Sequence, residues 1–287
     1  MMSRMMVCKN VLSRSMVLAC LCGASGLVLA NEAVWTEGDT SGPVRHYVLG
    51  AALASSQAHV GREDRSTGLQ PVLGVWFGRY RLASGGAGAL LSVGRETVDS
   101  GLSTTLAKDG NWALGGSLSW DGGREEDDGD PWLRGAPELK STLRGKVSLS
   151  YALGPRWSLG LSANQDLLGR DGGGQIGFGL GYRQPISERT YWDASVGASW
   201  GGKTYMQGHY GLTPEAAAAA GRLTDVHEPG AGWERLSLNW GLRSAINHNW
   251  VWFGGLGFSQ LLGDARRSPL VGERNVWSAN VGIAYRY

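Results

Sequence analysis

The sequence alternates between apolar and small polar residues over several segments of about ten residues each. In residues 235–243 one face is apolar and the other is polar: Leu236, Leu238, Trp240 and Leu242 against Ser237, Asn239, Gly241 and Arg243. A period of two places alternate side chains on opposite faces of a β-strand. After residue 31, no apolar run approaches the roughly 20 residues that a membrane-spanning helix requires. The chain therefore either crosses a bilayer as strands or stays outside it.

The composition of the polar faces separates these two possibilities. The alternation recurs in residues 143–151, 156–164, 190–200 and 275–287, where the polar positions are mostly Gly, Ser and Asn. A β-sandwich is the alternative fold, and it would expose its polar face to water. Charged residues make up only 18% of the chain, whereas soluble domains average about a quarter. Because small polar residues suit a curved, crowded interior, we predict an all-β fold, a transmembrane antiparallel β-barrel.

Basic residues within the predicted strands share the parity of the small polar residues. They are Arg144, Lys146, Arg183, Arg243 and Arg286. An Arg on the lipid face at mid-bilayer costs about 2–4 kcal/mol, so we predict that these five side chains line the lumen. Aromatic residues stand near the ends of the apolar faces, where the membrane interfaces would lie: Trp112, Trp120, Trp192, Trp200, Trp277 and Tyr287.

The lengths of the connections give the strand count. We predict about twelve strands, with ten as the alternative because the third and fourth strands have weak patterns. The predicted strands cover residues 45–55, 69–81, 86–95, 99–107, 111–121, 140–153, 156–167, 174–184, 190–202, 234–246, 250–262 and 275–287. Short turns, the first at 83–85, alternate with longer loops, apart from a brief loop near Glu96. Outer-membrane barrels combine short periplasmic turns with long outer loops, so both termini are expected in the periplasm.

The first 30 residues form a predicted signal peptide. A basic beginning precedes an apolar stretch over residues 16–29 and the small residue Ala30. Lipoprotein cleavage at Cys20 is the alternative, which the poor fit of Leu18 and the continuing apolar stretch disfavour. Residues 31–287 would then be the barrel. All three cysteines lie in residues 1–30, so the mature chain has no thiol chemistry.

Two loops contain distinctive patterns. Residues 121–130 are strongly acidic and suggest either a divalent-cation site or a solvated loop. We favour the solvated loop because the spacing of a calcium-binding loop is missing. Residues 213–221 predict a short helix, with a capping Thr, a Pro at the first position, five alanines and a final Gly. This helix would lie inside the longest outer loop, either as a partial plug or over the rim.

The sequence also contains patterns that resemble catalytic motifs. Residues 197–201 match the nucleophile-elbow pattern around Ser199, but that motif needs a strand-to-helix turn and we expect no helix there. Residues 172–177 match a dinucleotide-binding pattern but precede a strand. The five histidines lack metal-ligand spacing, and a net charge of +2 gives no basic tract. We expect a non-enzymatic protein with no cofactor, no metal site and no nucleic-acid partner.

Several stretches resemble the MipA/OmpV family of outer-membrane proteins, also called MltA-interacting proteins. The resemblance covers most of residues 120–287 and is vaguer over 40–120. It rests on residues 132–135, 179–185, 205–216, 229–233, 254–264, 268–271 and 282–287. This sequence departs from the family pattern at Leu212 and at the terminal Tyr287.

The resemblance implies a barrel in the Gram-negative outer membrane, in contact with its lipid and inserted by the barrel assembly machinery. It also implies a scaffold role towards a lytic transglycosylase and a murein synthase, with no catalytic residues to transfer. A passive, porin-like channel and an adhesin-like protein are the alternatives. The predicted periplasmic turns are short, so they leave little surface for the scaffold role. Sequence alone does not decide between an open lumen and one closed by residues 203–233.

Overall fold

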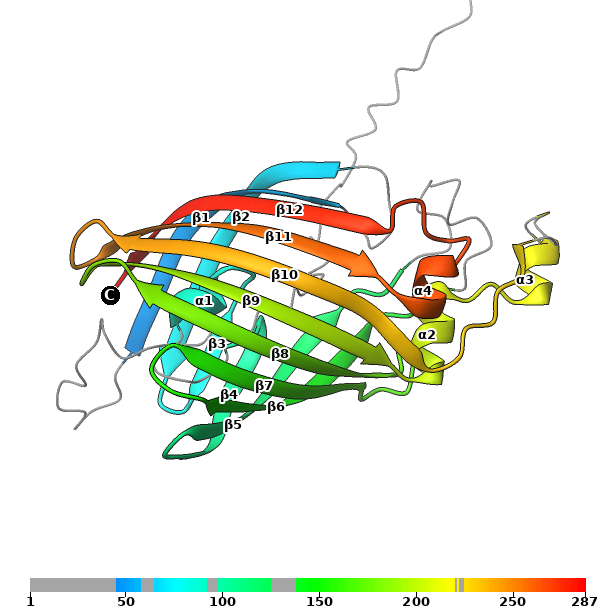
Figure 1. Cartoon of the computed structure of the whole chain (residues 1–287), viewed down its shortest axis with the longest axis horizontal. Helices are drawn as coiled ribbons and strands as arrows, with labels where there is room; N and C mark the ends of the chain where they lie inside the picture. The colour runs from blue at the N-terminus through cyan, green and yellow to red at the C-terminus, as the bar shows by residue number, and fades with distance from the viewer. Residues whose placement is uncertain (1–44, 58–64, 92–97, 125–137, 220, 222–224) are drawn as a thin grey trace, which may run out of the picture.

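The chain folds into one closed barrel of twelve antiparallel strands, in which each strand pairs with its neighbours in sequence and β1 pairs with β12 (Figure 1). The structure is a computed structural model and describes residues 45–57, 65–91, 98–124, 138–219, 221 and 225–287. The strands are β1 (Arg45–Gln57), β2 (Arg65–Phe77), β3 (Tyr80–Ala83), β4 (Gly101–Asp109), β5 (Trp112–Asp121), β6 (Thr142–Ala152), β7 (Trp157–Asp166), β8 (Gly174–Pro185), β9 (Thr190–Gly201), β10 (Gly232–Ala245), β11 (Trp250–Leu261) and β12 (Asn275–Arg286). The helices are α1 (Ala87–Leu91), α2 (Lys203–Tyr210), α3 (Pro214–Ala219) and α4 (Gly263–Arg267). The predicted fold and strand number are confirmed.

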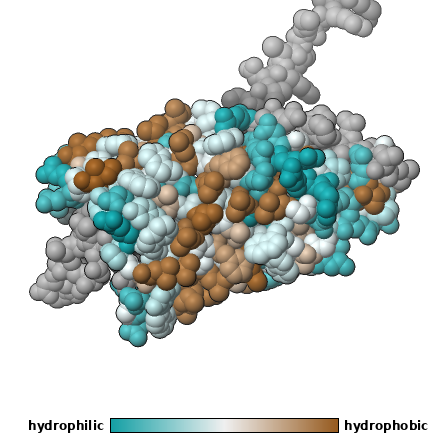
Figure 2. Space-filling model, viewed as in Figure 1, coloured by the Kyte–Doolittle hydropathy of each residue, from teal (hydrophilic) through white to brown (hydrophobic). Residues whose placement is uncertain are grey.

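The outward faces of the strands carry the apolar side chains. Leu69, Leu256 and Trp277 are each more than half exposed on this surface. Figure 2 shows hydrophobic side chains gathered across the middle of the visible face, with hydrophilic ones towards its ends. An apolar belt around a closed sheet is the surface that a lipid bilayer accommodates. In the described part of the chain, no helix has both the length and the apolar character needed to span a membrane.

The two ends of the barrel differ in the length of their connections. One end, called here the turn end, carries turns at 78–79, 110–111, 153–156, 186–189 and 246–249. The start of β1 and the end of β12 also lie there, joined by hydrogen bonds between Tyr47 and Tyr287. The other end, called the loop end, carries the long connections and α2, α3 and α4 (Figure 1). In outer-membrane barrels the short turns face the periplasm.

The sequence-based boundaries of the second and third strands are wrong. The turn after β2 lies at Gly78–Arg79 and not at 83–85, because Gly78 adopts the left-handed conformation (φ +59°) that permits a tight turn. The strand predicted at 86–95 is replaced by the four-residue β3 and by α1. Pro71, in the part of β2 that β3 does not reach, lacks the N–H that a neighbouring strand would bind.

α1 lies inside the barrel and packs on the inner faces of β1, β2, β11 and β12 (Figure 1). The buried cluster consists of Val48, Ala52, Val72, Ala83, Ala87, Leu91, Phe253 and Ala284. The packing is close: a Cβ atom added at Gly74 would lie 2.6 Å from Cδ1 of Leu91. We call α1 and this cluster the α1 plug. It gives the lumen an apolar wall that period-two alternation alone does not predict.

Two other predictions have different outcomes. The predicted helix at 213–221 is confirmed as α3, where the Thr213 hydroxyl accepts a hydrogen bond from the Ala216 amide at 3.3 Å. Ala217 of this helix is buried against Leu212 and Leu270, so α3 packs on the loops of the loop end. The predicted signal peptide (1–30) and most of the acidic segment 121–130 lie outside the described residues.

We expect Leu91→Ala to loosen the α1 plug, because deleting a buried Leu side chain costs about 2–5 kcal/mol. The measurement is thiol labelling of Ala87→Cys, a position that is fully buried in the native barrel. Labelling should be slow in the single variant and faster once Leu91→Ala is added. Leu153→Ala, at an exposed aliphatic residue of the turn end, is the control. Equal labelling rates in all three proteins would contradict the packing described here.

Candidate functional site in the barrel lumen

The five basic residues predicted for the lumen all stand at inward-facing strand positions. Arg144 and Lys146 lie on β6 towards the loop end and the middle. Arg183, Arg243 and Arg286 lie on β8, β10 and β12 within three residues of the turn end. The structure therefore divides the predicted set into two groups with different surroundings.

The two cations of β6 are neutralised by nearby carboxylates. Lys146 donates a hydrogen bond of 2.9 Å to Asp99, which also accepts one from Ser117. Arg144 lies 3.6 Å from Asp121 and donates to Asn164 at 2.7 Å. It also donates to two backbone carbonyls of the β7–β8 connection. Both side chains thus serve to hold strands and loops together.

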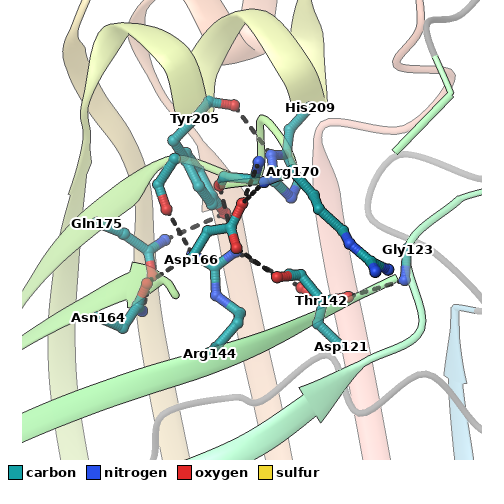
Figure 3. Close-up of polar contacts among 12 residues, drawn as sticks. Asp121, Gly123, Thr142, Arg144, Asn164, Asp166, Arg170, Gln175, Tyr205 and His209 are labelled. Carbon is teal, nitrogen blue, oxygen red and sulfur yellow. Dashed lines mark hydrogen bonds and ion pairs between the residues drawn. The ribbon is translucent and has the colours of Figure 1, made fainter. Parts of the chain in front are cut away.

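Asp166 organises the connection between β7 and β8, beside Arg144. Its carboxylate accepts hydrogen bonds from the Thr142 hydroxyl and from the backbone amides of Leu168, Arg170 and Gly172 (Figure 3). The loop it shapes reaches α2: a Cβ atom added at Gly173 would lie 2.2 Å from the Tyr205 amide nitrogen. A side chain at Gly173 would therefore push the loop and the helix apart.

α2 lies across part of the loop end, and we call it the α2 lid. The lid is held by Glu234, a carboxylate with no exposed surface. Glu234 accepts hydrogen bonds from the phenols of Tyr205 (3.2 Å) and Tyr210 (2.8 Å) on α2. From the barrel wall it accepts bonds from Ser199 at 2.7 Å and from Gln175. A buried charge with this many donors is stable because each lone pair is satisfied.

A β-bulge explains why Glu234 points into the lumen. The pairing of β10 with β9 shifts register between Trp233 and Arg235, which inserts one extra residue into β10. Trp233 stays exposed on the outside, whereas Glu234 is buried and Arg235 is 3.0 Å from its carboxylate. Bulges redirect side chains in this way at the rims of barrels.

Further contacts along α2 hold the helix in its place at the loop end. Tyr205, Met206 and Tyr210 are buried in a cluster that also contains Leu261 and Ala265 of β11 and α4. Arg124 donates to the carbonyls of Gly208 and His209 near the carboxyl end of α2, and Ser268 donates to that of Tyr210. Burial and the adjacent carboxylate raise the pKa values of Tyr205 and Tyr210, which keeps both phenols protonated as donors.

The expectation that no helix follows Ser199 is wrong, because α2 begins at Lys203. The local sequence pattern does not predict α2, because the buried apolar residues of this helix contact residues that are distant in sequence. Ser199 itself stays within β9 and donates its hydroxyl hydrogen to Glu234. His209 contacts the Tyr205 carbonyl at 2.9 Å. Among the described residues, Ser199 and His209 therefore form no nucleophile–base pair.

The two tyrosines of the lid lie within a segment that carries the family resemblance, and Glu234 directly follows another such segment. Residues 205–216 contain the lid tyrosines, and residues 229–233 lead directly into Glu234. A family model described as MltA-interacting protein MipA matches residues 49–287. The chain belongs to the MipA family. The α1 plug, the α2 lid and the basic residues of the lumen are thus features of a MipA-family barrel.

Solved structures resemble this MipA-family chain at low sequence identity. An outer membrane channel from Pseudomonas putida F1 is 15% identical, and the match covers 88% of this chain and 100% of that one with a TM-score of 0.45. The CymD monoaromatic hydrocarbon channel is 11% identical, with 91% and 98% covered and a TM-score of 0.40. OmpT from Vibrio cholerae is 9% identical, with 87% and 100% covered and a TM-score of 0.39. No curated protein sequence matches the chain.

We expect Glu234→Ala to release the α2 lid. Removing one partner of a buried, hydrogen-bonded charge costs about 3–5 kcal/mol, and here it leaves two buried phenols and Arg235 without their shared acceptor. Amide hydrogen exchange over residues 205–210 should accelerate strongly, and less so in Glu234→Gln, which keeps an acceptor oxygen. Glu215→Ala, at an exposed residue of α3, is the matched control. Unchanged exchange in Glu234→Ala would show that the carboxylate does not hold the lid.

Docking of the lid should weaken in mild acid. Burial lowers the pKa of His209 from 6.5 to about 4; the Tyr205 carbonyl and Glu234 oppose this shift, and Arg124 and Arg144 add to it. Because the docked state resists protonation, the stability it gains from neutral His209 is complete above pH 6.5 and is lost as pH falls towards 4.

The measurement is amide exchange over α2 at pH 7.5 and 5, corrected for the intrinsic exchange rate at each pH. His209→Gln should flatten the pH dependence, and His248→Gln, at an exposed turn residue, should not. An identical pH dependence in the wild type and His209→Gln would rule out His209 as the cause.

Proposed function

We propose that this MipA-family protein is a non-enzymatic barrel of the Gram-negative outer membrane that anchors peptidoglycan-remodelling enzymes at its periplasmic side. The family description names an interaction with MltA, and the sequence resemblance implies a lytic transglycosylase and a murein synthase as partners. The observation that carries the proposal is that two internal elements fill part of the lumen, one near each end. An apolar plug stands on the wall near the turn end, and a hydrogen-bonded lid covers part of the loop end.

The surface available to periplasmic partners is the set of turns at the turn end. Exposed charged residues project from these turns and their flanks: Arg79, Lys108, Asp109, Arg156, Glu188 and Arg189. Basic residues outnumber acidic ones there, by four to two. A basic rim favours an acidic complementary surface on the partner and accelerates its association. Short turns limit the contact area, which suits a weak or transient complex.

We expect purified protein in detergent to bind a purified MltA-type lytic transglycosylase or a bifunctional murein synthase from the same organism. The double variant Arg156→Ser, Arg189→Ser should reduce binding, more strongly at low ionic strength, because both charges lie on the turn-end surface. The double variant Lys140→Ser, Arg266→Ser removes the same charge from the loop end and should bind as the wild type does. Retention of neither enzyme by the wild type would refute the anchoring proposal.

A selective channel is the second candidate, and the basic residues of the lumen favour it. Arg183, Arg243 and Arg286 place positive charge near the turn end of the lumen. Single-channel recordings in planar bilayers separate the two functions. The anchoring proposal expects a silent wild type, and Glu234→Ala tests whether the lid alone keeps it silent. A wild type that conducts steadily with anion selectivity would favour the channel.

A further inference from the structure

Two guanidinium groups converge on Tyr191 of β9 near the turn end of the lumen. They belong to Arg183 of β8 and Arg243 of β10, and Arg286 of β12 lies towards the same end. Arg243 donates a hydrogen bond of 3.0 Å to the Tyr191 hydroxyl. The guanidinium carbon of Arg183 lies 4.6 Å from the centre of the Tyr191 ring, and that of Arg243 lies 5.5 Å from it. We call Arg183, Tyr191 and Arg243 the arginine cluster.

The arginine cluster has more positive charge than its carboxylate neighbour balances. Asp193 stands directly opposite Arg183 in the β8–β9 pairing. Its closest approach to a cluster guanidinium is 3.6 Å, to Arg243, and its buried Oδ1 atom accepts no hydrogen bond. Arg183 and Arg243 therefore share one loosely engaged carboxylate. By contrast, Arg144 and Lys146 each lie within 4 Å of a carboxylate of their own.

Arg183 is the group whose bonding is incomplete. Only 7% of the residue is exposed. In the described part of the chain its side chain makes no hydrogen bond, and its Nε atom is buried without a partner. A guanidinium presents five N–H donors in a planar fork that matches the two oxygens of a carboxylate or a phosphate. Burying such a group without acceptors is costly, so its donors are available to a ligand that brings oxygens.

One side of the arginine cluster is apolar. Arg243 pairs across the strands with Phe253, which belongs to the α1 plug. A Cβ atom added at Gly86, beside the first residue of α1, would lie 3.8 Å from the Phe253 ring. The other side lies near the turn end, where Tyr191, Arg243 and Arg286 keep part of their surface exposed. A small ligand from that end would meet the guanidiniums beside the apolar residues of the plug.

We propose that the arginine cluster is a binding site for a small oxyanion, a carboxylate or a phosphate group, that enters from the turn end of the barrel. The anion would accept hydrogen bonds from the Arg183 fork and face the charge of Arg243. This site goes beyond the anchoring function and does not depend on it. A barrel without enzyme partners, or one that conducts no ions, would still bind the anion.

The test is isothermal titration of the full-length barrel in detergent, with sodium phosphate in one arm and sodium acetate in the other, at constant chloride concentration. Saturable binding of at least one probe is expected. Arg183→Gln should weaken it about 10- to 100-fold, the effect of losing hydrogen bonds to a charged group. Arg183→Lys keeps the charge but loses the fork, so it should weaken binding less. Comparison of the two arms identifies which oxyanion the site prefers.

The matched control is Lys146→Gln, which removes one positive charge from the lumen away from the arginine cluster. Its affinity should equal that of the wild type. If Arg183→Gln does not fold, Arg183→Lys and Lys146→Gln still distinguish binding at Arg183 from non-specific attraction of the anion by the positive charge of the lumen. Equal loss in Lys146→Gln and the Arg183 variants, or no saturable binding of either probe, would overturn the proposal.

Discussion

Every backbone polar group of this chain within a bilayer must find its partner inside the protein, because lipid offers none. The pairing of β1 with β12 meets that condition by removing the free edges of the sheet. Closure then fixes the parity of every strand, with apolar side chains outside and small polar ones inside. Several of the inward charges are paired inside the lumen with carboxylates, phenols and backbone carbonyls.

The lumen is obstructed in two chemically different ways. The α1 plug relies on apolar contacts such as that of Leu91 with Gly74, whereas the α2 lid relies on hydrogen bonds that meet at Glu234. The apolar contact is insensitive to pH, whereas the lid includes a buried histidine that resists protonation. Both elements fill part of the barrel interior, one near each end.

Sequence predicts the barrel well because parity and loop length are local signals. The strands from β5 to β12 follow their predicted spans closely, since apolar and small polar residues alternate along most of each strand. It fails at α1, where Ala87 to Leu91 contact strands from both ends of the chain. Glu234 was missed because a bulge changes its direction, and no local pattern reveals a bulge. The grouping of Arg183 and Arg243 around Tyr191 depends on the register of β8, β9 and β10, so parity predicts their face but not their proximity.

The position of α1 bears on how the protein is assembled. The α1 plug includes Val48 and Ala52 of β1 and Ala284 of β12, the strands that form the β1–β12 junction. Those strands approach so closely that a Cβ atom at Gly50 would lie 2.4 Å from the Ile283 carbonyl oxygen. Joining the first and last strands therefore completes the surface on which the helix packs. Closure of the barrel and packing of its interior are therefore coupled, because the buried cluster around α1 includes residues on both sides of the junction.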